Sequence, residues 1–207
     1  MQALILVDLQ NDFVPGGALA VPGGDEIVPL ANRLQGCFDL VVATQDWHPP
    51  GHASFAASHP GKSPGDVITL DGLEQTLWPT HCVQNTPGAA LVSRLDTARI
   101  ARVIQKGTDA ALDSYSGFFD NGHRRPTGLD EYLRQQQVDR IYVLGLATDY
   151  CVKFTALDAR RLGFETSLIE DACRGVDLVK GDVDRAVEEM TAAEVRVIRS
   201  ENLLPKC

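Results

Sequence analysis

Six short runs of apolar, β-prone residues constrain the fold of this chain more than any other feature of its sequence. Most of them are apolar at consecutive positions, which is typical of strands buried on both faces of a parallel sheet. Segments of helical character lie between the runs, and this alternation implies right-handed βαβ crossovers and a three-layer α/β fold. The runs are ALILVDL (3–9), DLVVATQD (39–46), ARVIQKG (101–107), RIYVLGLA (140–147), ETSLIED (165–171) and VRVI (195–198).

Four segments between the runs carry helix signals. The first begins at Asp25, which we expect to act as its cap, and the second begins at a Thr127 cap. The third ends in two arginines and then Gly163, a good C-terminal signal. The four segments are 25–38, 127–137, 151–163 and 183–194.

Two stretches interrupt this rhythm, the loop-like residues 10–24 and a long insertion at about 46–90. The insertion is rich in Pro and Gly and holds both tryptophans and four of the five histidines. Loops of this length are usually functional or disordered, and the aromatic content argues against disorder. We expect a single domain over residues 1–207, with the insertion forming a lid and a metal site.

Composition excludes several classes of function. The formal net charge is -9 and no run of basic residues is present, which argues against nucleic acid or an anionic membrane as partner. The N-terminal MQALILVDLQNDF lacks the features of a signal peptide, and no apolar run approaches the roughly 18 residues of a membrane helix. We therefore expect a cytoplasmic protein that acts on a small molecule, as a monomer or a homo-oligomer.

The five cysteines are scattered, odd in number and without a CxxC pair. This favours reduced thiols over a disulfide framework. We expect Cys37, Cys82 and Cys173 to be packing residues and Cys207 to lie at an exposed terminus.

Chemically reactive residues follow the predicted strands where each ends. Asp8 ends the first run, Asp46 and His48 follow the second, Lys106 ends the third and Cys151 follows the fourth. Ligands of open parallel sheets bind beyond the carboxyl ends of the strands, so these groups should converge. Each has an ordinary structural interpretation alone, but together they indicate a nucleophile, a base and a charge stabiliser.

Cys151 stands at the expected start of a helix. Partial positive charge and free N–H groups at a helix N-terminus stabilise a thiolate and lower its pKa. The strand-to-helix turn can also present backbone N–H groups to an oxyanion. The alternative is that Cys151 is a small buried apolar residue.

Asp46 and His48 are two positions apart, so on an extended segment they point to the same side. With His81 they would form a metal site with open coordination positions. The spacing alone leaves metal binding undecided, and nearby side chains compete as further ligands, namely His52, Ser54 and His59. The aromatic residues of the two loops either anchor them or wall a flat ring-shaped substrate, namely Phe13, Trp78 and Tyr115.

Five segments together resemble the nicotinamidase/pyrazinamidase family of the isochorismatase-like cysteine hydrolases. They occur in the family's order over roughly residues 3–198. The segments are ILVDLQNDF (5–13), ATQDWHP (43–49), WPTHCVQNTPGA (78–89), KGTDAALDSYSGFFDNG (106–122) and VLGLATDYCVKFTALDARRLG (143–163). The resemblance implies a Rossmann-like fold with a six-stranded, mostly parallel sheet, and hydrolysis of nicotinamide to nicotinate and ammonia in NAD salvage, with pyrazinamide as a further substrate.

The same resemblance implies roles for single residues. Asp8 matches the general base, Lys106 the stabilising lysine and Cys151 the nucleophile. A cis peptide bond is implied before the nucleophile, and Leu146–Ala147 is favoured over Ala147–Thr148. The N–H groups of Ala147 and Cys151 would form the oxyanion hole. The ring pocket would be lined by Phe13, Trp78, Tyr115, Leu146, Ala147 and Tyr150.

The implied metal ligands are Asp46, His48 and His81. Ser54 stands where some relatives have a further ligand, so Ser54, His52 or water could complete the site. Such a ligand set suits one divalent ion, with zinc preferred and iron or manganese as alternatives. Competing functions are an isochorismatase-like amidohydrolase acting on a carbamoyl or ureido amide, and a non-catalytic ligand-binding module.

Overall fold

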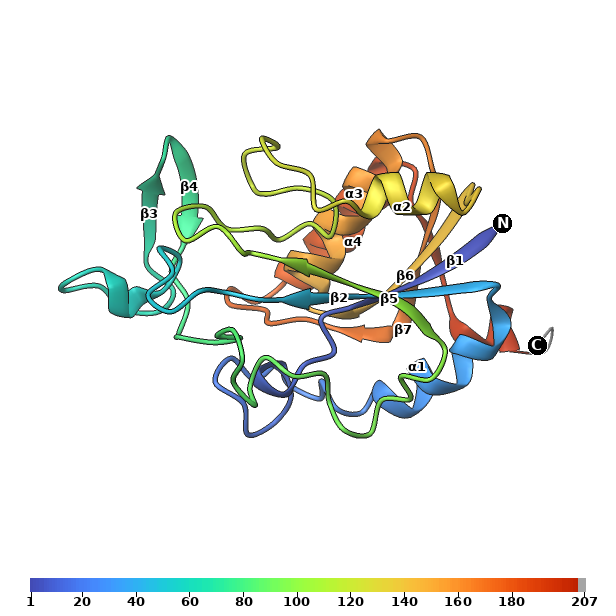
Figure 1. Cartoon of the computed structure of the whole chain (residues 1–207), viewed down its shortest axis with the longest axis horizontal. Helices are drawn as coiled ribbons and strands as arrows, with labels where there is room; N and C mark the ends of the chain where they lie inside the picture. The colour runs from blue at the N-terminus through green and yellow to red at the C-terminus, as the bar shows by residue number, and fades with distance from the viewer. Residues whose placement is uncertain (205–207) are drawn as a thin grey trace.

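The computed structural model describes residues 1–204 and has a twisted central sheet at its heart (Figure 1). All neighbouring strands of this sheet are parallel, in the order β5-β2-β1-β6-β7-β8. Each of the six predicted runs forms one of these strands, so the expected sheet is confirmed. The strands are β1 (Gln2–Val7), β2 (Leu40–Asp46), β5 (Ile100–Lys106), β6 (Arg140–Leu146), β7 (Glu165–Arg174) and β8 (Arg196–Ile198).

Helices cover both faces of the sheet. Figure 1 shows α2, α3 and α4 on one side and α1 on the other, which gives the three layers expected from the sequence. Short 3-10 turns occur at Asn11–Phe13, Gln35–Cys37, Ala56–Ser58 and Ser200–Asn202. The α-helices are α1 (Val28–Leu34), α2 (Leu129–Gln135), α3 (Lys153–Arg161) and α4 (Asp182–Ala192).

Three helix starts differ from the prediction. Gly128 rather than Thr127 is the N-cap of α2, although the Thr127 hydroxyl accepts the N–H of Leu129 at 3.2 Å. Asp25 does not cap α1, which begins after Ile27 with a proline in its first turn, a favoured position because proline lacks the N–H group that would be unpaired there. The helix α3 begins at Lys153 rather than Cys151, because Thr148–Val152 form a wider π-helical turn. Cys151 therefore lies in an irregular turn between strand and helix.

The strands β1 and β6 form the centre of the core, and their apolar side chains are almost fully buried on both faces. The strand β5 departs from the expectation of two-sided burial. It is an edge strand paired only with β2, and Ala101, Arg102 and Val103 are exposed on it. Its last residue, Lys106, is buried because it turns into the region beyond the strand ends.

The insertion contains structure that the sequence analysis read as loop. Residues Val67–Leu70 and Leu73–Thr76 form an antiparallel hairpin, β3 and β4. Asp71 and Gly72 both have positive φ values, 51° and 82°, as a tight hairpin turn of this type requires. The Asp-Gly pair between the two short strands was the overlooked signal.

One six-stranded sheet and one continuous hydrophobic core run through the described residues, and a single domain over residues 1–207 stays a prediction. No helix within residues 1–204 is both long and apolar enough to cross a membrane. Cys82 and Cys173 are buried with free thiols, in line with packing roles. The expectation for Cys207 lies outside the described residues.

Candidate active site

The residues predicted to converge do so at the carboxyl ends of the central strands. Asp8 directly follows β1, Asp46 ends β2, Lys106 ends β5 and Cys151 lies in the turn after β6. All four side chains are at least nine-tenths buried. Four reactive groups thus share one enclosed region where water is scarce.

Lys106 lies at the centre of this group. Its Nζ is 3.0 Å from Asp8 Oδ2 and 3.0 Å from Asp46 Oδ1. It donates a hydrogen bond to the Ser114 carbonyl at 2.8 Å and lies 3.5 Å from Cys151 Sγ. Burial would lower the pKa of Lys106, but the two carboxylates outweigh it and raise the pKa well above its usual value. Lys106 is therefore charged and links the thiol to Asp46.

Asp8 is fully buried and fixed through both carboxylate oxygens. Thr44 donates its hydroxyl to Oδ1 at 2.6 Å, and Lys106 contacts Oδ2. Burial is the largest influence on Asp8 and raises its pKa, although Lys106 and Thr44 act in the opposite direction. A carboxylate of raised pKa is a better proton acceptor, as general base chemistry needs.

The thiol of Cys151 does not have the lowered pKa expected from a helix N-terminus. Burial raises its pKa well above the usual value, and Lys106 only partly offsets this. The π-helical turn that carries Cys151 continues directly into α3, so the thiol does lie near a helix start, but burial outweighs that position and raises its pKa. The thiol is thus protonated at rest, and a base must take its proton when it reacts.

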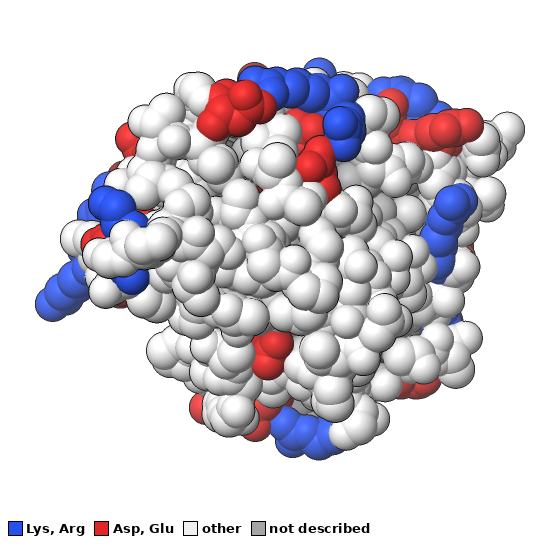
Figure 2. All heavy atoms as spheres, turned by 60° about the vertical axis from the view of Figure 1, so that its left-hand side comes forward, with Lys and Arg blue, Asp and Glu red and all other residues white. Residues whose placement is uncertain are grey.

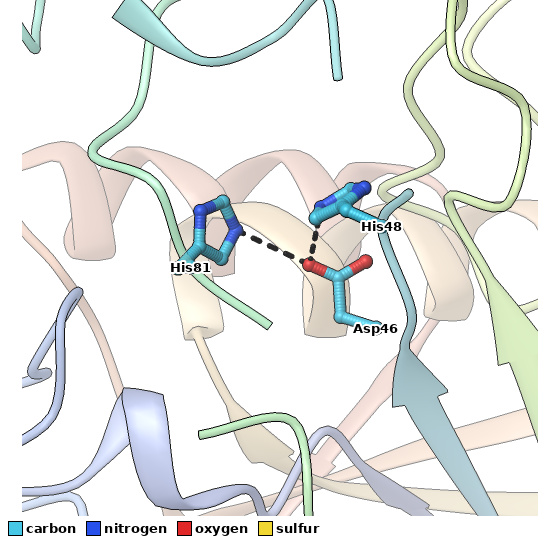
Figure 3. Close-up of side chains that lie close together, drawn as sticks. All are labelled: Asp46, His48 and His81. Atoms are coloured by element: carbon cyan, nitrogen blue, oxygen red, sulfur yellow. Dashed lines mark ion pairs between the residues drawn. The ribbon is translucent and has the colours of Figure 1, made fainter. Parts of the chain in front are cut away.

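Asp46, His48 and His81 come together as a buried trio (Figure 3). Asp46 Oδ2 lies 2.8 Å from His48 Nε2 and 3.2 Å from His81 Nε2. The opposite ring nitrogens, Nδ1, contact the Gly107 carbonyl at 3.0 Å and the Pro79 carbonyl at 2.8 Å. Such carbonyl contacts orient both rings and leave Nε2 free to bind a cation.

The donor set and its enclosure fit a divalent metal ion. One carboxylate and two imidazoles are borderline ligands that zinc, iron and manganese all accept. Gly107 is part of the enclosure, because a Cβ there would lie 2.5 Å from His48 Cε1 and 3.0 Å from Asp46 Oδ1. Its φ of 63° also favours glycine.

Of the residues proposed as further ligands, His52 lies beside this trio, with its ring centroid 4.3 Å from that of His48. His52, His48 and Asp113 also have their ligand atoms close enough to share an ion. The Ser54 hydroxyl is hydrogen-bonded to His52 Nδ1 at 2.8 Å, so it orients the imidazole ring of His52. His59 instead contacts the Ala53 carbonyl through Nε2 at 2.7 Å.

Two supporting residues escaped the sequence analysis because both occur in the loop-like QNDF stretch. The Gln10 side chain accepts a hydrogen bond from the Asp46 N–H at 2.7 Å and donates to the Asp46 carbonyl at 2.8 Å. Asp12 accepts the N–H of Cys82, next to His81, at 2.7 Å. The signal was their position directly after a strand that ends at the site.

A largely apolar cavity opens beside Cys151. Trp78 donates its Nε1–H to the Tyr115 hydroxyl at 3.1 Å and packs edge-on against Tyr150 at 4.7 Å between ring centroids. Leu146 is buried and does not contribute to the wall, contrary to expectation. The walls include three residues not foreseen, Leu19, Asp113 and Val176, beside Phe13, Asp46, Trp78, His81, Tyr115, Ala147, Tyr150 and Cys151.

The peptide bond Leu146–Ala147 is cis, as expected. Ala147 directly precedes the turn of Cys151, and both residues line the cavity. The cis peptide bond thus lies directly at the edge of the cavity.

Comparison with known proteins places this chain in a family. The sequence profile of the isochorismatase domain matches residues 2–202. The chain belongs to the isochorismatase family. Among curated members, a nicotinamidase of Escherichia coli is 54% identical over 196 residues, covering 93% of this chain and 92% of that protein.

Solved structures of the isochorismatase family agree with this fold. A nicotinamidase/pyrazinamidase of Acinetobacter baumanii superposes with a TM-score of 0.96 at 49% identity, covering 98% of both chains. A pyrazinamidase of Pyrococcus horikoshii in complex with zinc has a TM-score of 0.78 at 41% identity, covering 96% of this chain and 98% of that one.

Proposed function

We propose that this chain hydrolyses nicotinamide to nicotinate and ammonia in NAD salvage, through a thioester on Cys151. The observation that carries the proposal is the pairing of the Asp8–Lys106–Cys151 group with a metal-ligand trio across one apolar cavity. The high identity to curated nicotinamidases over nearly the whole chain supports the same substrate, and pyrazinamide is the second substrate we propose.

The first chemical step joins Cys151 to the amide. Asp8 removes the thiol proton, and the sulfur attacks the carboxamide carbon while Lys106 balances the negative charge. Because burial raises the pKa of this thiol, the sulfur needs Asp8 to accept its proton as it attacks. Asp8 then gives this proton to the leaving nitrogen, and ammonia departs.

The second step releases the acid. Asp8, again a carboxylate, takes a proton from water as the water oxygen attacks the thioester carbon. The C–S bond then breaks to release the acid, which ionises to nicotinate, and Asp8 returns its proton to the sulfur to restore the Cys151 thiol. In both steps the N–H groups of Ala147 and Cys151 are the proposed oxyanion donors. One donor of this kind contributes about 2.7–4 kcal/mol to stabilising a transition state.

Asp46, His48 and His81 are the proposed ligands of one divalent ion, with His52, Ser54, Asp113 or water completing its shell. Zinc is the first choice, supported by the zinc complex of the relative from Pyrococcus horikoshii, and iron or manganese are alternatives. When bound, this ion supplies a Lewis acid that orients the ring nitrogen of the substrate.

The cavity suits a flat, neutral aromatic amide. Trp78, Tyr115 and Tyr150 pack edge-on against one another in its wall. The proposed contacts with the ring are Phe13, Trp78, Tyr115, Ala147 and Tyr150. Figure 2, turned so that the strand ends come forward, shows a largely uncharged middle with one acidic side chain below its centre. Charged side chains of both signs lie along the upper edge and at the left, right and lower edges. A neutral substrate can approach this face without losing strong charge contacts.

The test is ammonia release from nicotinamide by zinc-loaded protein, with Cys151→Ala beside it. We expect turnover in the native chain and none in Cys151→Ala. Cys173→Ala is a matched control, because Cys173 is also buried, with its pKa raised by burial to about 12, and does not line the cavity. If the protein does not hydrolyse nicotinamide but does hydrolyse a carbamoyl amide, the proposed substrate is wrong and a carbamoyl amide takes its place.

We propose the cytoplasm as the site of this reaction, since a nucleophilic thiol stays reduced there. Monomer and homo-oligomer are both compatible with a site built from a single chain, and light scattering at working concentration distinguishes them.

A further inference from the structure

A second buried carboxylate lies in the nucleophile turn and has no part in the mechanism above. Asp149 is two residues before Cys151 and only 5% exposed. Its Oδ1 accepts the backbone N–H of Val176 at 3.0 Å, and its Oδ2 accepts that of Asp177 at 2.8 Å. One carboxylate thus grips two successive N–H groups of a different segment, the loop that follows β7.

This loop depends on Asp149 for its backbone bonds. Within residues 1–204, the N–H groups of Val176 and Asp177 donate to Asp149 and to no backbone carbonyl. The next anchor along the loop is Asp177 itself, whose Oδ1 accepts the N–H groups of Gly181 and Val183 at the start of α4. The loop is therefore fastened at one end to the nucleophile turn and at the other to α4.

The nucleophile turn has independent support. The Ala147 carbonyl accepts the N–H groups of Tyr150 and Val152, both at 3.1 Å. The strand β6 before the turn is paired on both sides, and α3 follows it directly. Loss of the Asp149 carboxylate should therefore displace the loop more than the turn that carries Cys151.

The loop matters because Val176 forms part of the cavity wall, on the same cavity as Cys151 and Tyr150. The fit between turn and loop is close at Gly175, where a Cβ would lie 2.2 Å from Val183 Cγ2 and 3.0 Å from Asp149 Oδ1. A small shift of this segment would move Val176 relative to a bound ring.

We infer that Asp149 is a positioning residue, which holds Val176 against the substrate ring by binding the backbone of its loop. This inference rests on the proposed function, because it concerns the binding of that substrate. Asp149 touches neither the reacting atoms nor the metal ligands, so its effect falls on substrate binding rather than on the chemical step.

The variant Asp149→Asn keeps the side-chain shape but turns one acceptor into an amide donor, facing an N–H group. A buried hydrogen bond of this kind corresponds to about a five- to tenfold change in an equilibrium. We expect the KM for nicotinamide to rise by about this factor, with kcat within about twofold of the native value. The rate at which iodoacetamide alkylates Cys151 should also stay within about twofold, because the turn keeps its own bonds.

The matched control is Asp120→Asn. Asp120 is 7% exposed and accepts the N–H groups of Arg124 and Arg125, both at 2.9 Å, away from the cavity lining. It should lose comparable thermal stability and keep the native KM. A purely structural role for Asp149 predicts that the two variants behave alike.

A double-mutant cycle with Val176→Ala tests whether Asp149 affects KM through Val176. If Asp149 acts through Val176, then Asp149→Asn should raise KM much less in the Val176→Ala background. An unchanged KM in Asp149→Asn, an equal rise in Asp120→Asn, or full additivity in the cycle overturns the inference. Should Asp149→Asn not fold, an unchanged KM in Val176→Ala overturns it equally.

Calorimetric titration with nicotinate separates this inference from the proposed function. Lack of turnover by the native enzyme contradicts the function. Native turnover with equal nicotinate affinity in the native protein and Asp149→Asn contradicts the positioning role alone.

Discussion

The positive charge of Lys106 is shared between two halves of the site. Its Nζ contacts Asp8, the proposed base, and Asp46, a proposed metal ligand, at equal distances of 3.0 Å. A bare carboxylate at either position would be very costly at this degree of burial. The same ammonium lies 3.5 Å from Cys151 Sγ, so charge that forms on the sulfur meets a fixed cation. Catalysis and folding therefore depend on one residue.

Replacement of Lys106 tests this double role. Lys106→Met leaves two buried carboxylates without their cation, so we expect a loss of about 3–5 kcal/mol in the free energy of unfolding. Urea unfolding at saturating zinc measures it. Lys153→Met is the control, since Lys153 pairs with the exposed Glu189 and such a pair contributes about 0–1 kcal/mol. Equal losses in both variants would contradict the central placement of Lys106.

The raised pKa of Asp8 predicts the acid limb of the pH profile. The base works only when unprotonated, so kcat/KM should fall as pH falls through a pKa above the ordinary carboxyl value of 3.8. The folded state holds this proton more tightly than the unfolded chain, so Asp8 itself does not favour acid unfolding. Initial rates from about pH 4 to 8, with metal content checked at each pH, measure the limb. If the midpoint of this fall in kcat/KM lies at or below the ordinary carboxyl pKa, burial does not raise the pKa of Asp8.

The sequence identified Asp8, Lys106 and Cys151 because each follows a strand end, which is a one-dimensional signal. It could not give their protonation, which depends on neighbours brought close only by folding. Cys151 shows this, since the helix-start argument gave the wrong direction for its pKa and burial decided it. Thr44 was missed for the same reason, as nothing in the chain marks its 2.6 Å bond to Asp8.

At the scale of elements, the site depends on how β1 and β2 end. Backbone pairing between them stops at Leu6 and Ala43. Beyond that point the amide of Gln10 substitutes for a strand, binding both the N–H and the carbonyl of Asp46. The Gln10 side chain thus takes the place of a neighbouring strand at Asp46 and fixes the backbone of this proposed metal ligand.

Gln10→Glu should therefore weaken metal binding. The variant removes the donor to the carbonyls of Asp46 and Ala89, both 2.8 Å away, and places a carboxylate against them. Loss of such a supporting contact raises metal dissociation constants about 10- to 100-fold. Competition with a zinc chelator measures the change. Gln105→Glu, an exposed glutamine on β5 that bonds Gln45, should keep native affinity, and equal weakening there would argue against the Gln10 contact.

The turn after β5 gives a second prediction at this scale. Gly107→Ala would push a Cβ to 2.5 Å from His48 and strain a residue with a φ of 63°. We expect loss of high-affinity zinc binding as well as stability. Gly72→Ala has a φ of 82° but meets nothing within 4 Å, so it should cost only the roughly 1–2 kcal/mol of left-handed backbone. Retained zinc affinity in Gly107→Ala would mean that His48 can move away.

At the scale of the whole molecule, the sequence predicted where the strands lie along the chain but not their order in the sheet. Continuous apolar runs predicted the parallel sheet, but they did not show that β5 is an edge strand with an exposed middle. The β3–β4 hairpin was missed because its short strands are half exposed and carry little apolar periodicity. The part that resisted prediction is the overhanging insertion, whose conformation depends on contacts with the strand ends below it.

Because the proposed metal ligands connect the strand ends to the insertion, we predict that bound metal raises the free energy of unfolding of the whole chain. The proposed ligands join β2 to the far end of the insertion, and an ion bound only by the folded state adds about 4 kcal/mol at 1,000 times its dissociation constant. For a chain of this size that corresponds to roughly 8–16 °C in Tm. Calorimetry of zinc-loaded and chelator-treated protein should show this gap, and His48→Ala should abolish it. His59→Ala, which removes only a contact to the Ala53 carbonyl, should retain the gap. If both variants retain it, zinc stabilises the fold at another site, and the insertion is held over the strand ends by packing alone.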